Sequence, residues 1–154
     1  MKGSDVLMKA LIIYSSIHHG NTKMVAAVLS KTLSADLFQI DEMKGISLKQ
    51  YDLIGFGSGI YNGKHHEKLY KMIEKANLKE KEVFVFSTSG TGNGKYNNLL
   101  IEKLTSKGAL IKNSFSCRGY DTYGIFKLIG GISRSHPDNK DFENAQNFAM
   151  NLLR

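Results

Sequence analysis

The fold of this protein is decided by residues 10–22, which read ALIIYSSIHHGNT. Residues 10–14 form an uninterrupted apolar run, which is typical of a strand covered on both faces in a parallel sheet. From about Thr22 onward, apolar residues recur at spacings of three and four, which predicts an amphipathic helix. A turn rich in hydroxyl groups and glycine joins the two. Such a turn directs backbone N–H groups and the positive end of the helix dipole at one point. Residues 15–22 therefore predict a site for an anion, most often a phosphate.

Apolar runs and helical patterns alternate along the rest of the chain. The further predicted strands cover residues 35–40, 51–58, 83–86 and 114–118. The further predicted helices carry their apolar residues at 69–76, at 99–104 with an expected stop at Lys107-Gly108, and from Pro137 toward the C-terminus. Five strands that alternate with helices predict an α/β fold, a doubly wound parallel sheet with helices on both faces.

The loops that leave three of these strands share an unusual composition. Residues 15–21, 57–63 and 87–94 are dense in glycine, serine, threonine and asparagine, whereas the opposite connection at 79–82 is an ordinary charged turn. Parallel sheets of this kind bind ligands beyond the carboxyl ends of their strands, near the switch point. We therefore expect the site at this edge, where Tyr61 offers a ring for stacking against a flat ligand.

Composition sets the class of protein and its surroundings. The 154 residues suffice for one domain, which we place at residues 8–154, with residues 1–7 as a flexible extension. The single cysteine, Cys117, has no partner for an internal disulfide, so we expect a cytoplasmic location. No apolar run approaches the roughly 20 residues that span a bilayer. The net charge of +7 predicts association with acidic surfaces.

Some local patterns suggest other chemistries, but their spacing argues against them. Adjacent histidines at 18–19 and 65–66 point in divergent directions without a cysteine or carboxylate cluster, so no metal site is predicted. Gly94-Lys95 is similar to the end of a phosphate-binding P-loop. However, Ser89 stands at the position of the first glycine of that motif, and Tyr96 stands at the position of its serine or threonine. The glycines of 55–59 have the wrong spacing for a dinucleotide fingerprint.

Three motifs together resemble a known family. Residues Tyr14-Ser15-Ser16 with Gly20-Asn21-Thr22, the loop Gly57-Ser58-Gly59-Ile60-Tyr61 and the loop Ser87-Thr88-Ser89-Gly90 resemble the flavodoxins, in the branch of short flavodoxin-like proteins. The resemblance extends from Met8 to the last helix. It implies a sheet of order 2-1-3-4-5, non-covalent FMN and electron transfer through the flavin. One departure is that the phosphate loop is about one residue longer, and His19 replaces the hydroxyl expected before Gly20.

The resemblance also implies which residues contact FMN. The phosphate would be held in the first loop by Ser15, Ser16, Gly20, Asn21 and Thr22, with His18 and His19 beside them. The isoalloxazine would be flanked by Ser58, Gly59, Ile60 and Tyr61, followed by a turn at Asn62 and Gly63 whose peptide can reorient toward flavin N5. The pyrimidine edge and ribityl chain would be lined by Thr88, Ser89 and Gly90, with Gly92 in the same loop.

The sequence predicts one leading function and one alternative. The leading prediction is an FMN-binding flavoprotein that transfers electrons between redox partners with acidic docking surfaces; the cofactor does the chemistry and no catalytic residue is predicted. The alternative is a small FMN-dependent oxidoreductase acting on a quinone or porphyrinogen, like the flavodoxin-like protoporphyrinogen oxidases. A flavin-free nucleic-acid binder has no recognised motif to support it. The long irregular segment 117–137 is expected either to cap the flavin or to build a docking surface.

Overall fold

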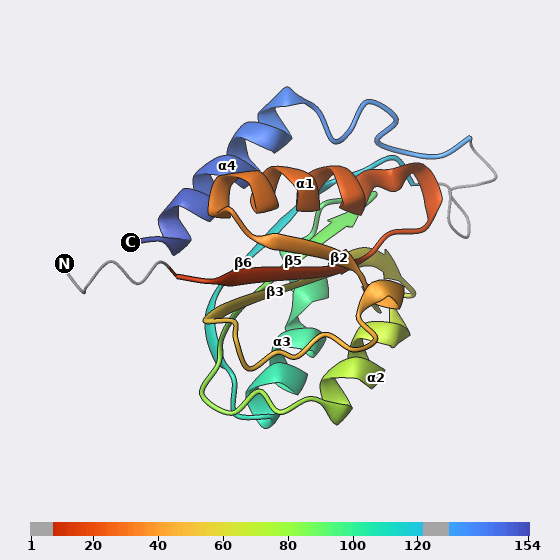
Figure 1. Ribbon diagram of the computed structural model, residues 1–154. Helices are drawn as coiled ribbons and strands as arrows, with labels where there is room; N and C mark the ends of the chain where they lie inside the picture. The colour runs from red at the N-terminus through yellow and green to blue at the C-terminus, as the bar shows by residue number, and fades with distance from the viewer. Residues whose placement is uncertain (1–7, 122–129) are drawn as a thin grey trace.

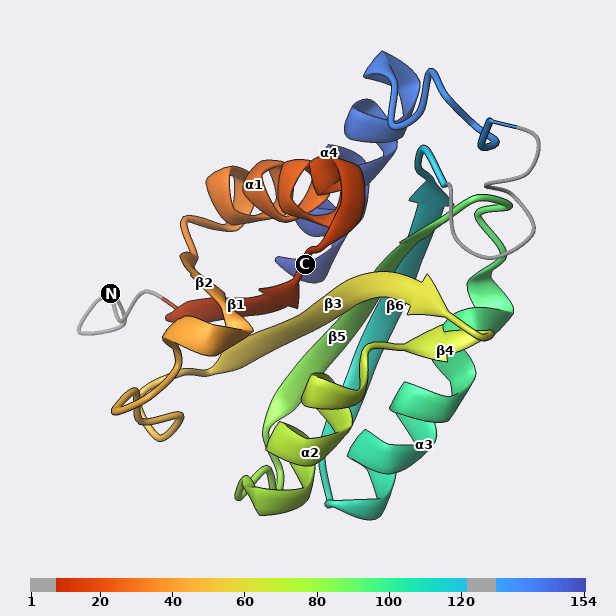
Figure 2. The ribbon, with the colours of Figure 1, turned by 90° about the vertical axis from the view of Figure 1, so that its right-hand side faces the viewer.

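The computed structural model describes residues 8–121 and 130–154, so the predicted extension at residues 1–7 lies outside the described part. Within it, five parallel strands run side by side in the order β2-β1-β3-β5-β6 (Figure 1; Figure 2). They are β1 (Ala10–Ser15), β2 (Asp36–Gln39), β3 (Leu53–Tyr61), β5 (Glu82–Ser89) and β6 (Leu110–Arg118). Since β5 and β6 are the fourth and fifth predicted strands, the predicted order 2-1-3-4-5 is confirmed.

Three strands extend beyond their predicted bounds, and one of them is β5, predicted at 83–86 and observed from Glu82 to Ser89. The prediction that residues 59–61 form a loop is wrong, because β3 continues to Tyr61 and pairs there with a short antiparallel strand, β4 (Lys64–His65). The Asn-Gly pair between them is a hairpin signal that the strand prediction did not use. The edge strand β6 begins at Leu110 and not at 114. Its first half combines two apolar residues, Leu110 and Ile111, with polar Lys112 and Asn113 and is largely exposed, so it lacks the long apolar run that marks a strand buried on both faces.

In the described residues four α-helices cover the two faces of the sheet (Figure 1). On one face lie α1 (Asn21–Leu33) and α4 (Asn139–Leu152), and on the other α2 (Glu67–Lys75) and α3 (Asn98–Ser106). Two hydrophobic cores result: Ile12 belongs to the core under α1 and α4, whereas Leu11 and Ile13 belong to the other. Successive residues of a strand point to opposite faces, so a strand buried on both must be apolar throughout.

Two glycines of β3 make room for aromatic rings on the neighbouring strand. A Cβ placed on Gly55 would meet the ring of Phe84, and one on Gly57 would meet the ring of Phe86. Both phenylalanines are fully buried in the core under α1 and α4. Packing against these rings accounts for the glycines at positions 55 and 57, so they need not belong to a nucleotide-binding motif.

The ends of the helices follow their local sequence. Gly108, with φ +84°, follows the last turn of α3, as predicted from Lys107-Gly108. Asp138 caps α4, accepting a hydrogen bond from the Asp141 backbone N–H, while the Asp141 carboxylate accepts from the Asp138 backbone N–H. Not one helix in the described ranges has the length and apolarity needed to cross a membrane.

Candidate functional site

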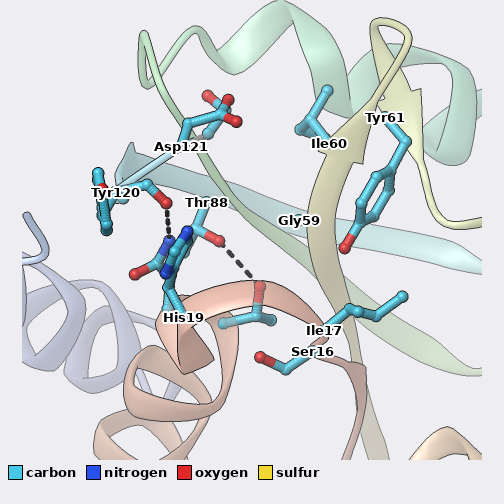
Figure 3. A pocket seen from close by; sticks show the side chains of 13 residues that line it. Ser16, Ile17, His19, Gly59, Ile60, Tyr61, Thr88, Tyr120 and Asp121 are labelled. Atoms are coloured by element: carbon cyan, nitrogen blue, oxygen red, sulfur yellow. Dashed lines mark hydrogen bonds between the residues drawn. The ribbon is translucent and has the colours of Figure 1, made fainter. Parts of the chain in front are cut away.

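A hollow lies at the edge of the sheet where the parallel strands end (Figure 3). Its empty volume is about 410 Å³, the open solvent at its mouth included. Three regions contribute: the loop between β1 and α1, the ends of β3 and β5, and the residues after β6. The lining residues are Ser16, Ile17, His19, Asn21, Thr22, Gly59, Ile60, Tyr61, Thr88, Ser89, Gly119, Tyr120 and Asp121.

The first wall is the turn between β1 and α1. The short helical turn η1 (His18–Gly20) leads into α1, and both His19 and Gly20 have positive φ, 59° and 67°. The N-cap residue of α1, Gly20, has no side chain to cap the helix, and the first turn of α1 carries no acidic residue. The positive end of the helix dipole therefore faces the hollow without a compensating charge of its own.

Ser16 fixes the start of this turn. Its backbone N–H donates to Gln39 Oε1 and its carbonyl accepts from Gln39 Nε2, both at 3.2 Å, so β2 holds the peptide from two sides. The Ser16 hydroxyl accepts a hydrogen bond from the Lys23 backbone N–H at 3.2 Å. These hydrogen bonds fix the conformation of the loop between β1 and α1.

Two threonines join the first loop to the centre of the sheet. Thr22 Oγ1 and Thr88 Oγ1 lie 2.8 Å apart, and both residues are buried (Figure 3). Thr22 lies in the first turn of α1 and Thr88 near the end of β5, so this hydrogen bond links two residues that are 66 positions apart in the sequence. Both side chains are neutral and each hydroxyl can donate or accept.

The second wall is the hairpin of β3 and β4. Its turn, Asn62-Gly63, has φ of 52° and 79°, as a two-residue type I′ turn requires. Tyr61 and Gly59 line the hollow from the end of β3. In Figure 3 the Tyr61 ring stands on the side of the hollow opposite Tyr120 and His19.

The third wall consists of Gly119, Tyr120 and Asp121, which belong to the segment 117–137 that was expected to cap the flavin or to build a docking surface. Tyr120 packs against His19 with 4.2 Å between ring centroids, and its carbonyl accepts a hydrogen bond from Asn21 Nδ2 at 2.7 Å. Gly119 is pressed against Asn21 so closely that a Cβ there would meet the amide at 2.6 Å. Asp121 Oδ2 accepts from the Gly90 backbone N–H at 3.3 Å. The segment after β6 therefore closes one side of the hollow.

Comparison with known proteins identifies the family. Residues 11–129 match the family model described as flavodoxin domain. This chain belongs to the flavodoxin family. It is 46% identical over 149 residues to an uncharacterized protein of Methanocaldococcus jannaschii, covering 96% of this chain and 99% of the relative. It is 28% identical over 173 residues to the flavodoxin-like domain-containing protein BilS of Clostridioides difficile, covering 95% and 97%.

The solved structures agree on the fold. Oxidised Flavodoxin 2 from Bacillus cereus superposes with a TM-score of 0.72 at 24% identity, over 94% of this chain and 97% of that one. The doubly wound sheet predicted from the sequence is thus the flavodoxin fold, and its family is one of flavin-binding proteins.

The structure places the predicted flavin contacts of this flavodoxin in two groups. Nine of them line the hollow together: Ser16, His19, Asn21, Thr22, Gly59, Ile60, Tyr61, Thr88 and Ser89. The others stand behind or beside the lining: Ser15, Gly20, Ser58, Asn62, Gly63, Gly90 and Gly92. Of His18 only the backbone is described. As flavin contacts, all of these residues remain predictions.

Three of the second group have visible reasons for their position. Ser58 is fully buried and turns its hydroxyl toward His65, away from the hollow. Gly90 is covered from outside, since a Cβ there would meet Ile132, and its carbonyl accepts from the Ser133 hydroxyl. Gly92 donates to Ser89 Oγ at 2.9 Å. The long segment 117–137 was expected to lie near the flavin, but residues 122–129 of it lie outside the described residues.

Cys117 is held in an unreactive form. Burial, together with the negative charges of Asp141 and Asp138, raises the pKa of its thiol to about 12. A thiol that stays protonated at neutral pH is a poor nucleophile. Cys117 therefore acts as a small buried hydrophobic residue.

A cluster of possible metal ligands also occurs near the start of α4. Within the described ranges, His136, Asp138 and Asp141 place one ligand atom each within 4.8 Å of one another. His136 Nδ1 lies 2.6 Å from Asp141 Oδ2, and the two aspartates form the capping box of the helix. Helix capping accounts for this arrangement.

Proposed function

We propose that this flavodoxin binds FMN non-covalently in the hollow and carries electrons between redox partners. The observation that carries the proposal is that one hollow combines a helix N-terminus free of acidic residues with aromatic rings on opposite sides. FMN has the matching two ends, a phosphate and a flat three-ring isoalloxazine. Bound FMN would supply one- and two-electron redox chemistry.

The phosphate end fits the first wall. The N-terminus of α1 offers backbone N–H groups and a positive dipole, and the nearby side chains are neutral donors. Ser16, Asn21 and Thr22 would hold the phosphate, with His19 beside it. No acidic side chain stands in the first turn of α1 to repel an anion.

The isoalloxazine end fits between the second and third walls. Tyr61 would stack on one side and Tyr120, backed by His19, would lie on the other. Ile17 is 49% exposed and Ile60 also lines the hollow, so apolar contact is available to the ring system. Thr88 and Ser89 would hydrogen-bond the ribityl chain and the polar edge.

We infer further that the partners carry acidic docking surfaces and that the protein works in the cytoplasm. Support for the first comes from 21 lysine and arginine residues against 14 aspartate and glutamate residues. Complementary charge speeds association, and salt screens it. An electron-transfer rate with an acidic partner that rises with ionic strength would contradict this part.

The experiment that tests the proposal is FMN binding followed by anaerobic reduction. The purified protein is mixed with FMN, passed through gel filtration and reduced stepwise while its visible spectrum is recorded. Flavin that stays with the protein and reduces in two separate steps supports an electron carrier. Absence of retained flavin, and of any fluorescence quenching, refutes FMN binding.

A second candidate function is an FMN-dependent oxidoreductase acting on a quinone or porphyrinogen. The observation in its favour is that residues 119–121 line the hollow, so the segment after β6 can shape a place for a second ligand. Reduction in one two-electron step, with multiple turnovers on a quinone or porphyrinogen, would favour this function over the carrier.

A further inference from the structure

Behind the hairpin wall lies a buried chain of three polar side chains. Ser58, His65 and Asn97 are 0%, 1% and 1% exposed. His65 Nε2 is 2.7 Å from Asn97 Oδ1, and His65 Nδ1 is 2.9 Å from Ser58 Oγ. Asn97 Nδ2 donates to the Phe115 carbonyl at 3.2 Å. The chain therefore connects the end of β3 to η3 (Gly94–Asn97) and to β6.

The direction of each hydrogen bond follows from the two ends. Because the Asn97 amide nitrogen donates to Phe115, its oxygen faces His65, and His65 Nε2 must carry a hydrogen. Burial lowers the pKa of His65 to about 4, so the imidazole is neutral at physiological pH and Nδ1 has no hydrogen. Nδ1 must then accept, and the Ser58 hydroxyl donates to it.

Ser58 has a second acceptor within reach, which gives the chain its consequence. The Gly59 carbonyl lies 2.6 Å from Ser58 Oγ, but a hydroxyl has one hydrogen to give. While His65 presents a bare Nδ1, the hydrogen is committed to it. Without His65 the hydroxyl turns to Gly59, and Gly59 and Ile60, whose peptide contains that carbonyl, both line the hollow.

We propose that His65 is a positioning residue for the flavin ring: through Ser58 it sets the peptides of residues 59–61 without touching the ligand itself. This proposal rests on the proposed binding of FMN. Ser58 Oγ also accepts from the His66 backbone N–H at 3.0 Å, so both strands of the hairpin meet at this one hydroxyl. The Asn62-Gly63 turn between those strands inherits their placement.

The hairpin wall would contact the flavin ring and not the phosphate. Loss of His65 should therefore weaken the binding of FMN and of riboflavin by the same factor. Two variants separate the hydrogen bond between His65 and Ser58 from the one between His65 and Asn97. In H65N the shorter amide stays near the position of Nδ1 and can still serve Ser58. In H65Q the longer amide reaches toward the position of Nε2, which keeps Asn97 and abandons Ser58. Y51F is the control, since it removes one part-buried side-chain hydrogen bond, from the Tyr51 hydroxyl to Asp36, away from the hollow.

The test measures dissociation constants for FMN and riboflavin by fluorescence quenching, with urea unfolding of the same four proteins. We expect H65Q to weaken both ligands roughly tenfold and H65N at most about threefold, while Y51F weakens neither, as loss of one hydrogen bond predicts. The flavin circular dichroism of H65Q should change, because the ring is seated differently.

Each contrary result has its own meaning. H65Q binding like the wild type overturns the proposal, as does a loss confined to FMN, which would place the effect at the phosphate. Equal losses in H65N, H65Q and Y51F that follow their unfolding free energies would make His65 merely structural. If the wild type binds neither flavin, the proposed function itself fails; if it binds both, only the role of His65 is in question.

Discussion

Replacing Thr88 with valine should show how much the hydrogen bond between Thr22 in α1 and Thr88 in β5 contributes to the free energy of unfolding. Valine has the shape of threonine without the hydroxyl, so T88V leaves Thr22 Oγ1 without its partner at 2.8 Å. Thr22 and Thr88 are only 1% and 4% exposed, too little for water to replace the bond freely. A buried hydroxyl left unpaired costs about 1–3 kcal/mol of unfolding free energy, a sizeable part of the roughly 5–15 kcal/mol of a typical domain.

The double variant T22V/T88V supplies the decisive comparison. With both hydroxyls replaced by methyl groups, no polar atom is stranded, so the double variant should be less destabilised than the sum of T22V and T88V, by about 1 kcal/mol or more. Urea unfolding of the flavin-free protein, followed by circular dichroism, measures all four free energies. Additive effects of the two single variants would show that water already serves these hydroxyls and would refute the reasoning.

Three further predictions follow from the buried residues. G57A should destabilise the protein by about 1–3 kcal/mol in urea, because its methyl group enters the ring of Phe86; an unchanged midpoint would contradict the packing. The pKa of His65 is lowered to about 4 from 6.5, so its roughly 3 kcal/mol of stability is present above pH 6.5 and lost as the pH falls toward 4. In H65Q the urea midpoint should therefore fall less between pH 6.5 and 4 than in the wild type. An equally steep fall in H65Q would show that other groups cause the loss of stability. Cys117 should resist thiol reagents at pH 8 until the protein unfolds, because burial raises its pKa to about 12; rapid labelling of the folded protein would exclude this.

Much of the fold was readable because it depends on local patterns. The apolar run at 10–14 predicted a strand buried on both faces, and β1 is buried at every residue. The helical starts at Thr22 and Pro137 and the stop at Gly108 lie within two residues of the observed ends. The strand ends were harder, since the first half of β6 is short of buried residues and the end of β3 is rich in glycine.

The candidate site was readable only in part. The loops after β1, β3 and β5 were recognisable by composition, and nine of the predicted contacts line one hollow. The third wall was not predicted residue by residue. Gly119, Tyr120 and Asp121 follow β6 with no repeating pattern, and only folding brings Tyr120 against His19, about a hundred positions earlier.

By itself the sequence determined the α/β class, the strand order through its family resemblance, and the edge of the sheet at which the hollow lies. These depend on periodicity and on turn chemistry, which short segments carry alone. Only the tertiary structure decided that Ser58 faces His65 and Asn97 inside the protein and not the hollow, although the sequence placed Ser58 among the flavin contacts. The direction of a side chain near a strand end depends on partners far away in the chain. Those partners become neighbours only when parallel strands align and their helices pack.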